Sequence, residues 1–369
     1  MAVARAVKEW AEKMDGKPPP DATGELSKQL GKSYTIYGSM LILPSRLLES
    51  GLWKLVTDQG PGAEKRFFEC VAKHSRISHI ACTKPIPFHK DSSHSENIVR
   101  SPSNFTPLFG DFGPNTASQP PTTADIESAY WVTAKQNGIA QTWAPRWTMF
   151  SRGNISEKQR LLELPSVQAS VEEGKRDSRG CAAVDLYAGI GYFTFSYLKA
   201  GFSKVLCWDL NPWSTEGLRR GAAANKWNSL SSDEKSDLTN MAKSDCRCLI
   251  FNESNEYAQA KIDSMRVDLP PIRHVNCGLL PTSKGSWDTA FAVLDPTLGG
   301  WVHVHENFEQ SEIEQKAEEV RSAFQSKLDA WRSKRDREVK LEYINRVKTY
   351  APGVYHVVLD IYVPPRQPS

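Results

Sequence analysis

One glycine-containing turn constrains the fold of this chain more than any other feature. Residues Cys181-Ala-Ala-Val-Asp185 are typical of a buried strand, and the segment after Gly189 and Gly191 has its apolar residues at helical spacing. Because glycine has no Cβ, the backbone there can adopt unusual angles and let a ligand approach closely. The pattern of strand, glycine turn and helix predicts a nucleotide-type binding turn in a parallel sheet.

A second strand with an acidic end supports this interpretation. Residues 204–208 have strand character and lead directly to Asp209, twenty positions after Gly189. A carboxylate at that place can accept both hydroxyl groups of a ribose. An ordinary strand-to-helix crossing explains a lone Gly-x-Gly, but it does not explain the acid that follows the next strand.

The residues around the turn favour S-adenosylmethionine over a nicotinamide dinucleotide. A dinucleotide site places a third glycine three residues after the second, so that a diphosphate can rest on the helix N-terminus. That position is Thr194 here. Asp185 would repel a diphosphate, whereas it could fix the ammonium group of a methionine moiety.

Length and composition narrow the class of protein. A chain of 369 residues is long enough for two or three domains, and its net charge of +3 is compatible with an RNA partner without requiring one. Its seven cysteines include no Cys-x-x-Cys pair, which indicates reduced thiols. Neither Cys246-x-Cys248 nor His303-x-His305 has further ligands at metal-site spacing, so we expect no metal. No apolar run is long enough to span a bilayer, so we expect a cytoplasmic protein without a membrane partner. We also expect a monomer.

Composition divides the chain into five segments. We expect a helix and a linker, then a small α+β domain that positions a macromolecular substrate, a low-complexity insertion, a hairpin with a cofactor-contacting linker, and the catalytic domain. In chain order these segments cover residues 1–30, 31–88, 89–127, 128–160 and 161–369. The hairpin is predicted around Asn137-Gly138, a dipeptide suited to a type I′ turn.

The catalytic segment predicts a doubly wound sheet. Five strands alternate with helices, a polar insertion is expected over 228–245, and a long amphipathic helix over 313–331 precedes a terminal antiparallel hairpin at Ala351-Pro-Gly. The five strands are expected at 181–185, 204–208, 246–251, 272–281 and 299–306, and the fourth is expected to end in a loop that contains Asn276 and Pro281. This α/β pattern is that of the Rossmann-like class I S-adenosylmethionine-dependent methyltransferases.

Three further places carry polar groups that could contact ligands. Asn154 or Ser156 can cap a helix with Lys158 in its first turns, and this helix is either a surface helix or one that faces a cofactor carboxylate or a phosphate. The loop 252–255 follows the third strand, where an acid or amide could recognise the adenine amino group. Arg219 and Arg220 are solvated side chains or contacts to RNA phosphates.

Six motifs make the chain resemble the eukaryotic tRNA wybutosine-synthesizing protein 2 family in a fungal form. Together they cover most of the chain after residue 130. The motifs are Met149-Phe-Ser-Arg-Gly-Asn-Ile-Ser-Glu-Lys158, Asp185-Leu-Tyr-Ala-Gly-Ile-Gly-Tyr-Phe-Thr194, Asp209-Leu-Asn-Pro212, Asn276-Cys-Gly-Leu-Leu-Pro-Thr-Ser283, Gly299-Gly-Trp-Val-His-Val-His-Glu-Asn307 and Arg346-Val-Lys-Thr-Tyr-Ala-Pro352.

The resemblance implies an enzyme that moves the 3-amino-3-carboxypropyl group of S-adenosylmethionine, its co-substrate, to the C7 carbon of 4-demethylwyosine. That base lies at position 37 of phenylalanine tRNA, and the step belongs to wybutosine biosynthesis. The resemblance and the turn together give a set of cofactor-binding residues: Ser151, Lys158, Asp185, Gly189, Gly191, Asp209, Glu253, Ser254, Asn255 and Asn276. Arg146, Arg219 and Arg220 are the expected RNA contacts, and the sequence names no catalytic base.

Two other functions are compatible with the same residues. A tRNA guanosine-37 N1-methyltransferase shares the glycine turn and the Asn-Pro pair, but its branch usually has a proline much closer to the asparagine of Asn276-Cys-Gly-Leu-Leu-Pro281. An inactive tRNA-binding scaffold would not need the glycines together with Asp185 and Asp209. The motifs therefore favour aminocarboxypropyl transfer.

Overall fold

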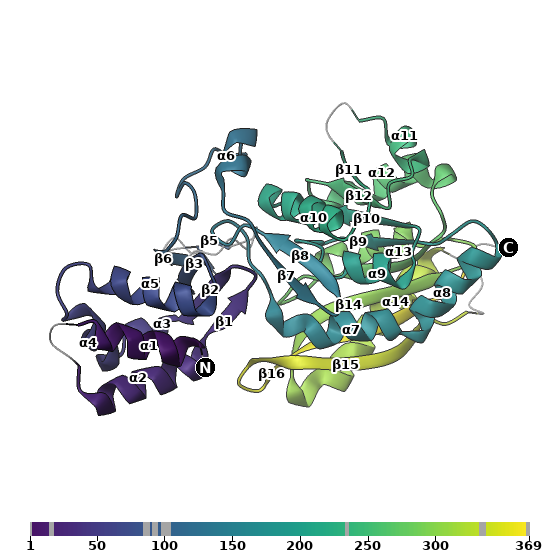
Figure 1. Ribbon diagram of the computed structural model, residues 1–369. Coiled ribbons are helices and arrows are strands. Elements are labelled where there is room, and N and C mark those ends of the chain that lie inside the picture. The colour runs from purple at the N-terminus through teal and green to yellow at the C-terminus, as the bar shows by residue number, and fades with distance from the viewer. Residues whose placement is uncertain are drawn as a thin grey trace. The chain divides into compact units, whose positions relative to one another are not determined.

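The computed structural model describes most of the chain, and its contacts divide it into two units (Figure 1). The first unit comprises Met1–Ala134 and Trp143–Met149, and the second comprises Lys135–Thr142 and Phe150–Ser369. The described residues are 2–14, 18–83, 89–90, 95–96, 105–232, 236–331 and 337–366.

The first unit is a small α+β fold. Its sheet has the order β1-β2-β3-β6, in which β2 and β3 are parallel and the two outer pairs are antiparallel. The strands are β1 Thr35–Tyr37, β2 Met40–Pro44, β3 His79–Thr83 and β6 Phe105–Phe109, with the two-residue strands β4 His89–Lys90 and β5 Ser95–Glu96. The helices are α1 Ala2–Glu12, α2 Pro20–Ser33, α3 Ser45–Leu48, α4 Lys54–Thr57, α5 Ala63–Ser75 and α6 Thr123–Ser128.

Two predictions for this unit are wrong. The predicted linker before residue 30 contains helix α2, because Leu26 and Leu30 are buried in the same apolar core as Trp10 of α1. The region 89–127, predicted to lack packed structure, contributes strand β6 to the sheet. A low overall apolar content hid the few aromatic residues, such as the buried Phe112, that anchor this segment.

The predicted hairpin forms strands β7 Val132–Gln136 and β8 Ile139–Trp143. Asn137 and Gly138 both have positive φ angles, 52° and 71°, as a type I′ turn requires. The dipeptide prediction is therefore confirmed.

The second unit contains the predicted doubly wound sheet, with the order β11-β12-β10-β9-β13-β14-β16-β15. The pairs from β11 to β14 are parallel, whereas β16 is antiparallel to both β14 and β15. The strands are β9 Ala182–Asp185, β10 Lys204–Trp208, β11 Ser229–Ser232, β12 Cys248–Phe251, β13 Ile272–Cys277, β14 Gly300–Glu309, β15 Lys340–Ala351 and β16 Val354–Val363. The terminal hairpin is confirmed.

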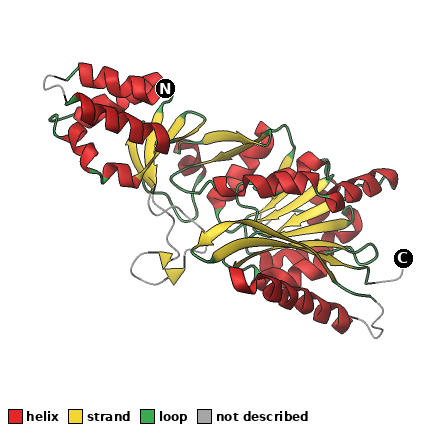
Figure 2. Ribbon diagram, turned by 90° about the horizontal axis from the view of Figure 1, so that it is seen from below, coloured by secondary structure: helices red, strands yellow, loops and turns green. Residues whose placement is uncertain are grey.

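Helices cover both faces of this sheet, and Figure 2 shows the yellow strands between red helices. One apolar core joins one face to α7–α10, and another joins the opposite face to α11–α14, because side chains alternate between the faces along each strand. The helices are α7 Ile155–Glu163, α8 Pro165–Arg176, α9 Thr194–Ala200, α10 Pro212–Ala224, α11 Leu238–Lys243, α12 Ala258–Met265, α13 Trp287–Val293 and α14 Ile313–Trp331.

Two expectations for the second unit need correction. The region 228–245, expected to be a polar insertion, contributes the edge strand β11 and helix α11. Edge strands tolerate polar residues because one side faces solvent, so the serines of β11 gave no strand signal. Asn276, expected in the loop after the fourth strand, is inside β13 and almost fully buried.

Candidate cofactor and base site

Asp185 ties the end of β9 to the start of α9. Its carboxylate accepts hydrogen bonds from the Thr194 N–H (3.1 Å), the Thr194 hydroxyl (2.9 Å) and the Asn276 amide (3.0 Å). Burial raises the pKa of Asp185, and these donors oppose the rise. Because Asp185 occupies a first-turn N–H of α9, that helix start is closed to a diphosphate.

The predicted role of Asp185 therefore changes. The Asp185 side chain is fully buried, and both of its carboxylate oxygens accept hydrogen bonds from the protein. It therefore holds the turn in place and does not present a free carboxylate to a methionine ammonium group. The two glycines also serve packing. A Cβ on Gly191 would come within 2.7 Å of Phe195 and Leu218, and both glycines have positive φ angles.

Asp209 has the geometry expected of a ribose acceptor. Its two carboxylate oxygens accept from the backbone N–H groups of Gly189 (2.8 Å) and Asn211 (2.9 Å), which fixes it beside the glycine turn. Unlike Asp185, it is partly exposed. Burial raises its pKa to about 6, although the two N–H donors oppose that rise. Each oxygen retains a lone pair for a further donor.

The loop after β12 lies at the same edge of the sheet and is tied to the neighbouring strands. The Asn255 amide donates to the carbonyl of Leu186 (2.8 Å), so this loop is fixed beside the turn after β9. Both oxygens of Glu253 are engaged, one by the Trp208 indole and one by Lys261. The Ser254 hydroxyl accepts from the backbone of Glu256. All three predicted adenosine contacts are bonded to the protein, and Glu253 is the one whose two carboxylate oxygens are both engaged.

Lys158 lies on the buried side of α7 and does not extend into solvent. Only 3% of the residue is exposed, and its ammonium donates to Gln141 (3.0 Å) and Gln136 and lies 5.5 Å from the ring centres of Phe150 and Tyr192. No carboxylate in the described part of the chain forms a salt bridge with it. Burial lowers its pKa to about 8. A buried ammonium surrounded by neutral partners is suited to an anionic ligand group.

Tyr192 connects this lysine to Ser151. Its hydroxyl accepts a hydrogen bond from the Ser151 N–H (3.0 Å), so the segment before α7 is fixed to the glycine turn. The sequence interpretation missed Tyr192, although its place directly after the second glycine was a usable signal. Asn154 begins α7 without a capping hydrogen bond, so the proposed cap is not formed there.

Buried histidines occupy the same sheet face as Asp185 and Asn276. His303 bonds His274 (2.9 Å) and Asp360 (2.7 Å), whereas His305 bonds only His356 (3.0 Å). Within the described residues, no group of three or more His, Cys, Asp or Glu side chains is arranged to hold a metal. His356 lies on another strand 51 residues later, so no local sequence signal could have identified it.

The three predicted RNA contacts belong to two different units. Arg219 and Arg220 are on α10, where both bond Glu216, and the Arg219 side chain is half exposed. Arg146 belongs to the other unit and is only partly exposed.

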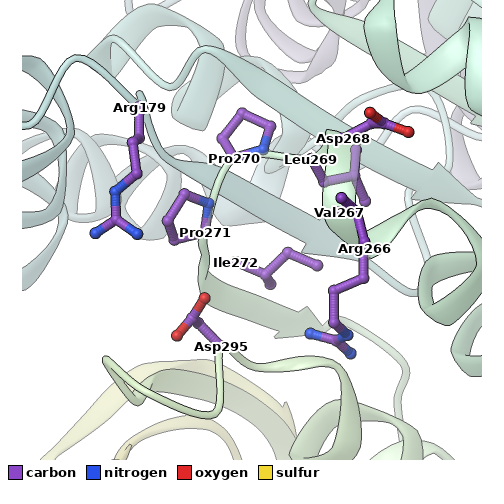
Figure 3. A pocket seen from close by; sticks show the side chains of 9 residues that line it. All are labelled: Arg179, Arg266, Val267, Asp268, Leu269, Pro270, Pro271, Ile272 and Asp295. Atoms are coloured by element: carbon purple, nitrogen blue, oxygen red, sulfur yellow. The ribbon is translucent and has the colours of Figure 1, made fainter. Parts of the chain in front are cut away.

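A cavity of about 390 Å³ lies away from this edge, at the amino ends of the strands (Figure 3). Arg179, Ile272 and Asp295 are among the residues that line it, and Ile272 is the first residue of β13. Because parallel sheets of this type bind ligands at the carboxyl ends of their strands, this cavity is not the predicted cofactor site. In the described part of the chain, no helix combines the length and the apolar character needed to cross a membrane.

The strand order, the glycine turn and Asp209 define the class of this protein as an S-adenosylmethionine-dependent transferase with a class I fold. Solved structures agree on the fold. A Pyrococcus horikoshii TYW2 in complex with MeSAdo aligns with a TM-score of 0.59 at 18% identity, covering 98% of this chain and 100% of that one. A complex of aTrm5 and tRNALeu aligns with a TM-score of 0.51 at 17% identity, covering 95% and 81%.

Sequence comparison identifies the family. The tRNA wybutosine-synthesizing protein 2 of Schizosaccharomyces pombe is 37% identical over 330 residues, covering 89% of this chain and 72% of the relative. The protein of that name from Saccharomyces cerevisiae is 33% identical over 330 residues, covering 82% and 63%. No family model matches the chain. The chain belongs to the tRNA wybutosine-synthesizing protein 2 family.

Proposed function

We propose that this chain transfers the 3-amino-3-carboxypropyl group of S-adenosylmethionine to the C7 carbon of 4-demethylwyosine at position 37 of phenylalanine tRNA. Membership of the family supports the reaction class. The observation in the structure that supports the proposal is that two charged side chains with remaining hydrogen-bonding capacity are each connected to the glycine turn. Asp209 is suited to the ribose, and Lys158 is suited to a carboxylate.

The proposed roles follow from these surroundings. Asp209 accepts the ribose hydroxyls, while Lys158 and the Ser151 segment hold the carboxylate of the methionine moiety. Asn255 and Ser254 border the adenosine, and Asp185 with Asn276 keeps the turn rigid from beneath. Arg146, Arg219 and Arg220 remain predicted tRNA contacts, and the monomeric state and cytoplasmic location remain predictions.

The enzyme must determine which of the carbons bonded to the sulfur of S-adenosylmethionine is attacked. Three carbons are bonded to the positive sulfur of the co-substrate, and the one held in line with the nucleophile reacts. A lysine that fixes the carboxylate determines where the aminocarboxypropyl arm points. Residues that place this arm toward the ring carbon, and the methyl group away from it, favour aminocarboxypropyl transfer over methylation.

Isotope labels test the proposal directly. The protein is incubated with phenylalanine tRNA containing 4-demethylwyosine and with S-adenosylmethionine labelled in either its methyl or its carboxyl carbon. We expect the carboxyl label, and not the methyl label, in the tRNA. Methyl label would establish the guanosine methyltransferase class of reaction, and absence of both labels despite cofactor binding would indicate the inactive scaffold.

A further inference from the structure

Several buried polar atoms at the carboxyl end of β14 have no hydrogen-bond partner among the residues that the structure describes. They include Nε2 of His305, Nδ1 of His356 and both amide atoms of Asn307. The Oδ1 atom of Asn276 is also buried and has no hydrogen-bond partner among the described residues. Buried polar groups without partners are rare in proteins and destabilise the fold, so a cluster of them indicates that a ligand or solvent group completes their bonding.

These atoms share one face and one edge of the sheet. Residues 303, 305 and 307 lie on one face of β14 because side chains alternate between the faces along a strand, and His356 is paired with Asn307 in the neighbouring strand. In the parallel pair with β13, Asn276 is opposite His303 and the final residue Cys277 is opposite Val304. His305 therefore lies just past the end of β13, where ligands of parallel sheets bind.

His305 also borders the cofactor turn. Its ring contacts Phe193 edge to face, with 4.9 Å between ring centres, and Phe193 belongs to the turn that follows Gly191. A Cβ on Gly278, in the loop after β13, would lie 3.8 Å from Phe193 and 2.9 Å from the Asn276 amide. The turn, the loop after β13 and His305 thus converge at one place.

We infer that His305 is the base that accepts the proton lost by the acceptor ring carbon. The inference rests on the proposed function. His305 is 2% exposed, its Nδ1 is hydrogen-bonded to His356, and its buried Nε2 has no partner among the described residues. The residue lies just past the end of β13, at the edge where ligands of parallel sheets bind. A ring nitrogen with a free lone pair in a dry site is a suitable proton acceptor.

The proton and electron balance of the step is complete. The ring carbon forms a bond to the γ-carbon of the aminocarboxypropyl arm, and the electron pair of the breaking carbon–sulfur bond stays on sulfur, which releases 5′-methylthioadenosine. The ring then carries a positive charge and an extra hydrogen. His305 Nε2 takes that proton, and the carbon–hydrogen electron pair restores the ring.

The neighbouring groups favour this role. If Nε2 is to accept, the neutral imidazole carries its hydrogen on Nδ1 and donates it to Nε2 of His356. Burial, His356, His303 and Arg160 lower the pKa of His305 well below its usual value, while Asp360 opposes them. The base is therefore deprotonated at neutral pH, and the strongly acidic ring cation does not require a stronger acceptor.

The test compares His305→Gln with wild type in single-turnover transfer of the carboxyl label. Glutamine keeps a polar group opposite His356 but cannot take the proton. We expect the transfer rate to fall at least about 100-fold, which is the lower end of the range for general base catalysis. Cofactor affinity should be unchanged. Deuterium at the acceptor ring carbon should slow the variant further and leave wild type unaffected, because proton loss becomes the slow step.

His305→Ala provides a second measurement. Added imidazole should restore part of the transfer rate of this variant. His74→Gln is the control, because His74 lies in the other unit and bonds Glu9 there, and imidazole should leave the rate of that variant unchanged. Wild-type rates in both His305 variants, or loss of transfer without an isotope effect and without imidazole rescue, would overturn the inference while the proposed function stands. A wild-type protein that transfers no carboxyl label would overturn both.

Discussion

His303 and His305 are two residues apart on one face of β14, yet their surroundings differ completely. His303 sits inside a closed chain in which Ser170 bonds His274, His274 bonds His303, and His303 bonds Asp360. Within the described part of the chain, His305 has one hydrogen-bond partner and one ring nitrogen without a partner. A His-x-His pattern thus provides one histidine that stabilises the fold and one that is available for chemistry.

The two aspartates of the turn repeat this contrast. Asp185 is fully buried and bonded to Thr194 and Asn276, whereas Asp209 is partly exposed and held by two backbone N–H groups. Complete internal bonding marks residues that support the site, and incomplete bonding marks residues that face a ligand. The following predictions test that distinction.

The largest effect is expected from Asp360→Ala. This change removes the shared partner of His303 and Arg160, and Asp360 is almost fully buried. Breaking a buried ion pair from one side costs about 3–5 kcal/mol. Urea unfolding should show that loss. A free energy of unfolding within about 1 kcal/mol of wild type would contradict the assigned role of the closed chain.

Asp209→Ala should affect the ligand and spare the fold. The ribose loses a charged acceptor worth on the order of 1.5–3 kcal/mol, so the affinity for S-adenosylmethionine should fall by roughly tenfold to 150-fold. Calorimetric titration measures this change. Thr194→Val is the matched control, because its hydroxyl bonds Asp185 inside the protein. Unchanged affinity in Asp209→Ala would remove Asp209 from the cofactor site.

The two histidines of β14 can be compared directly with leucine substitutions. His303→Leu leaves buried partners unsatisfied and should cost about 1–3 kcal/mol of unfolding free energy. His305→Leu leaves a single buried partner, His356, unsatisfied and also removes the unpartnered Nε2, so it should cost less than His303→Leu. Thermal or chemical unfolding of the two variants measures these losses in unfolding free energy. Equal losses would mean that their different hydrogen bonding does not distinguish their roles.

Cofactor affinity should depend on pH on both sides of neutrality. Asp209 must be ionised to accept, so affinity should fall below the pKa of about 6. Lys158 must be protonated to hold a carboxylate, so affinity should also fall above the pKa of about 8, by up to about tenfold per pH unit. Titrations from pH 5 to 9 with wild type and Lys158→Met test this. The acid limb should remain in the variant and the alkaline limb should vanish.

The sequence predicted the sheet and the turn because local patterns encode them. Strand, glycine turn and acid all lie within thirty residues, and the terminal hairpin is marked by Pro-Gly. The site depends on distant pairings that no local pattern contains. Whether Asp185 is free or bonded depends on Asn276, and whether His305 is paired depends on His356. Strand β11 was missed because an edge strand of serines has no apolar alternation.

The central claim is that the aminocarboxypropyl arm, and not the methyl group, leaves the sulfur. The most direct measurement identifies the nucleoside that remains after one turnover with 4-demethylwyosine-containing phenylalanine tRNA, by chromatography and mass spectrometry. The account predicts 5′-methylthioadenosine in an amount equal to the modified base. S-adenosylhomocysteine in its place would show that the methyl group moved and would contradict the account.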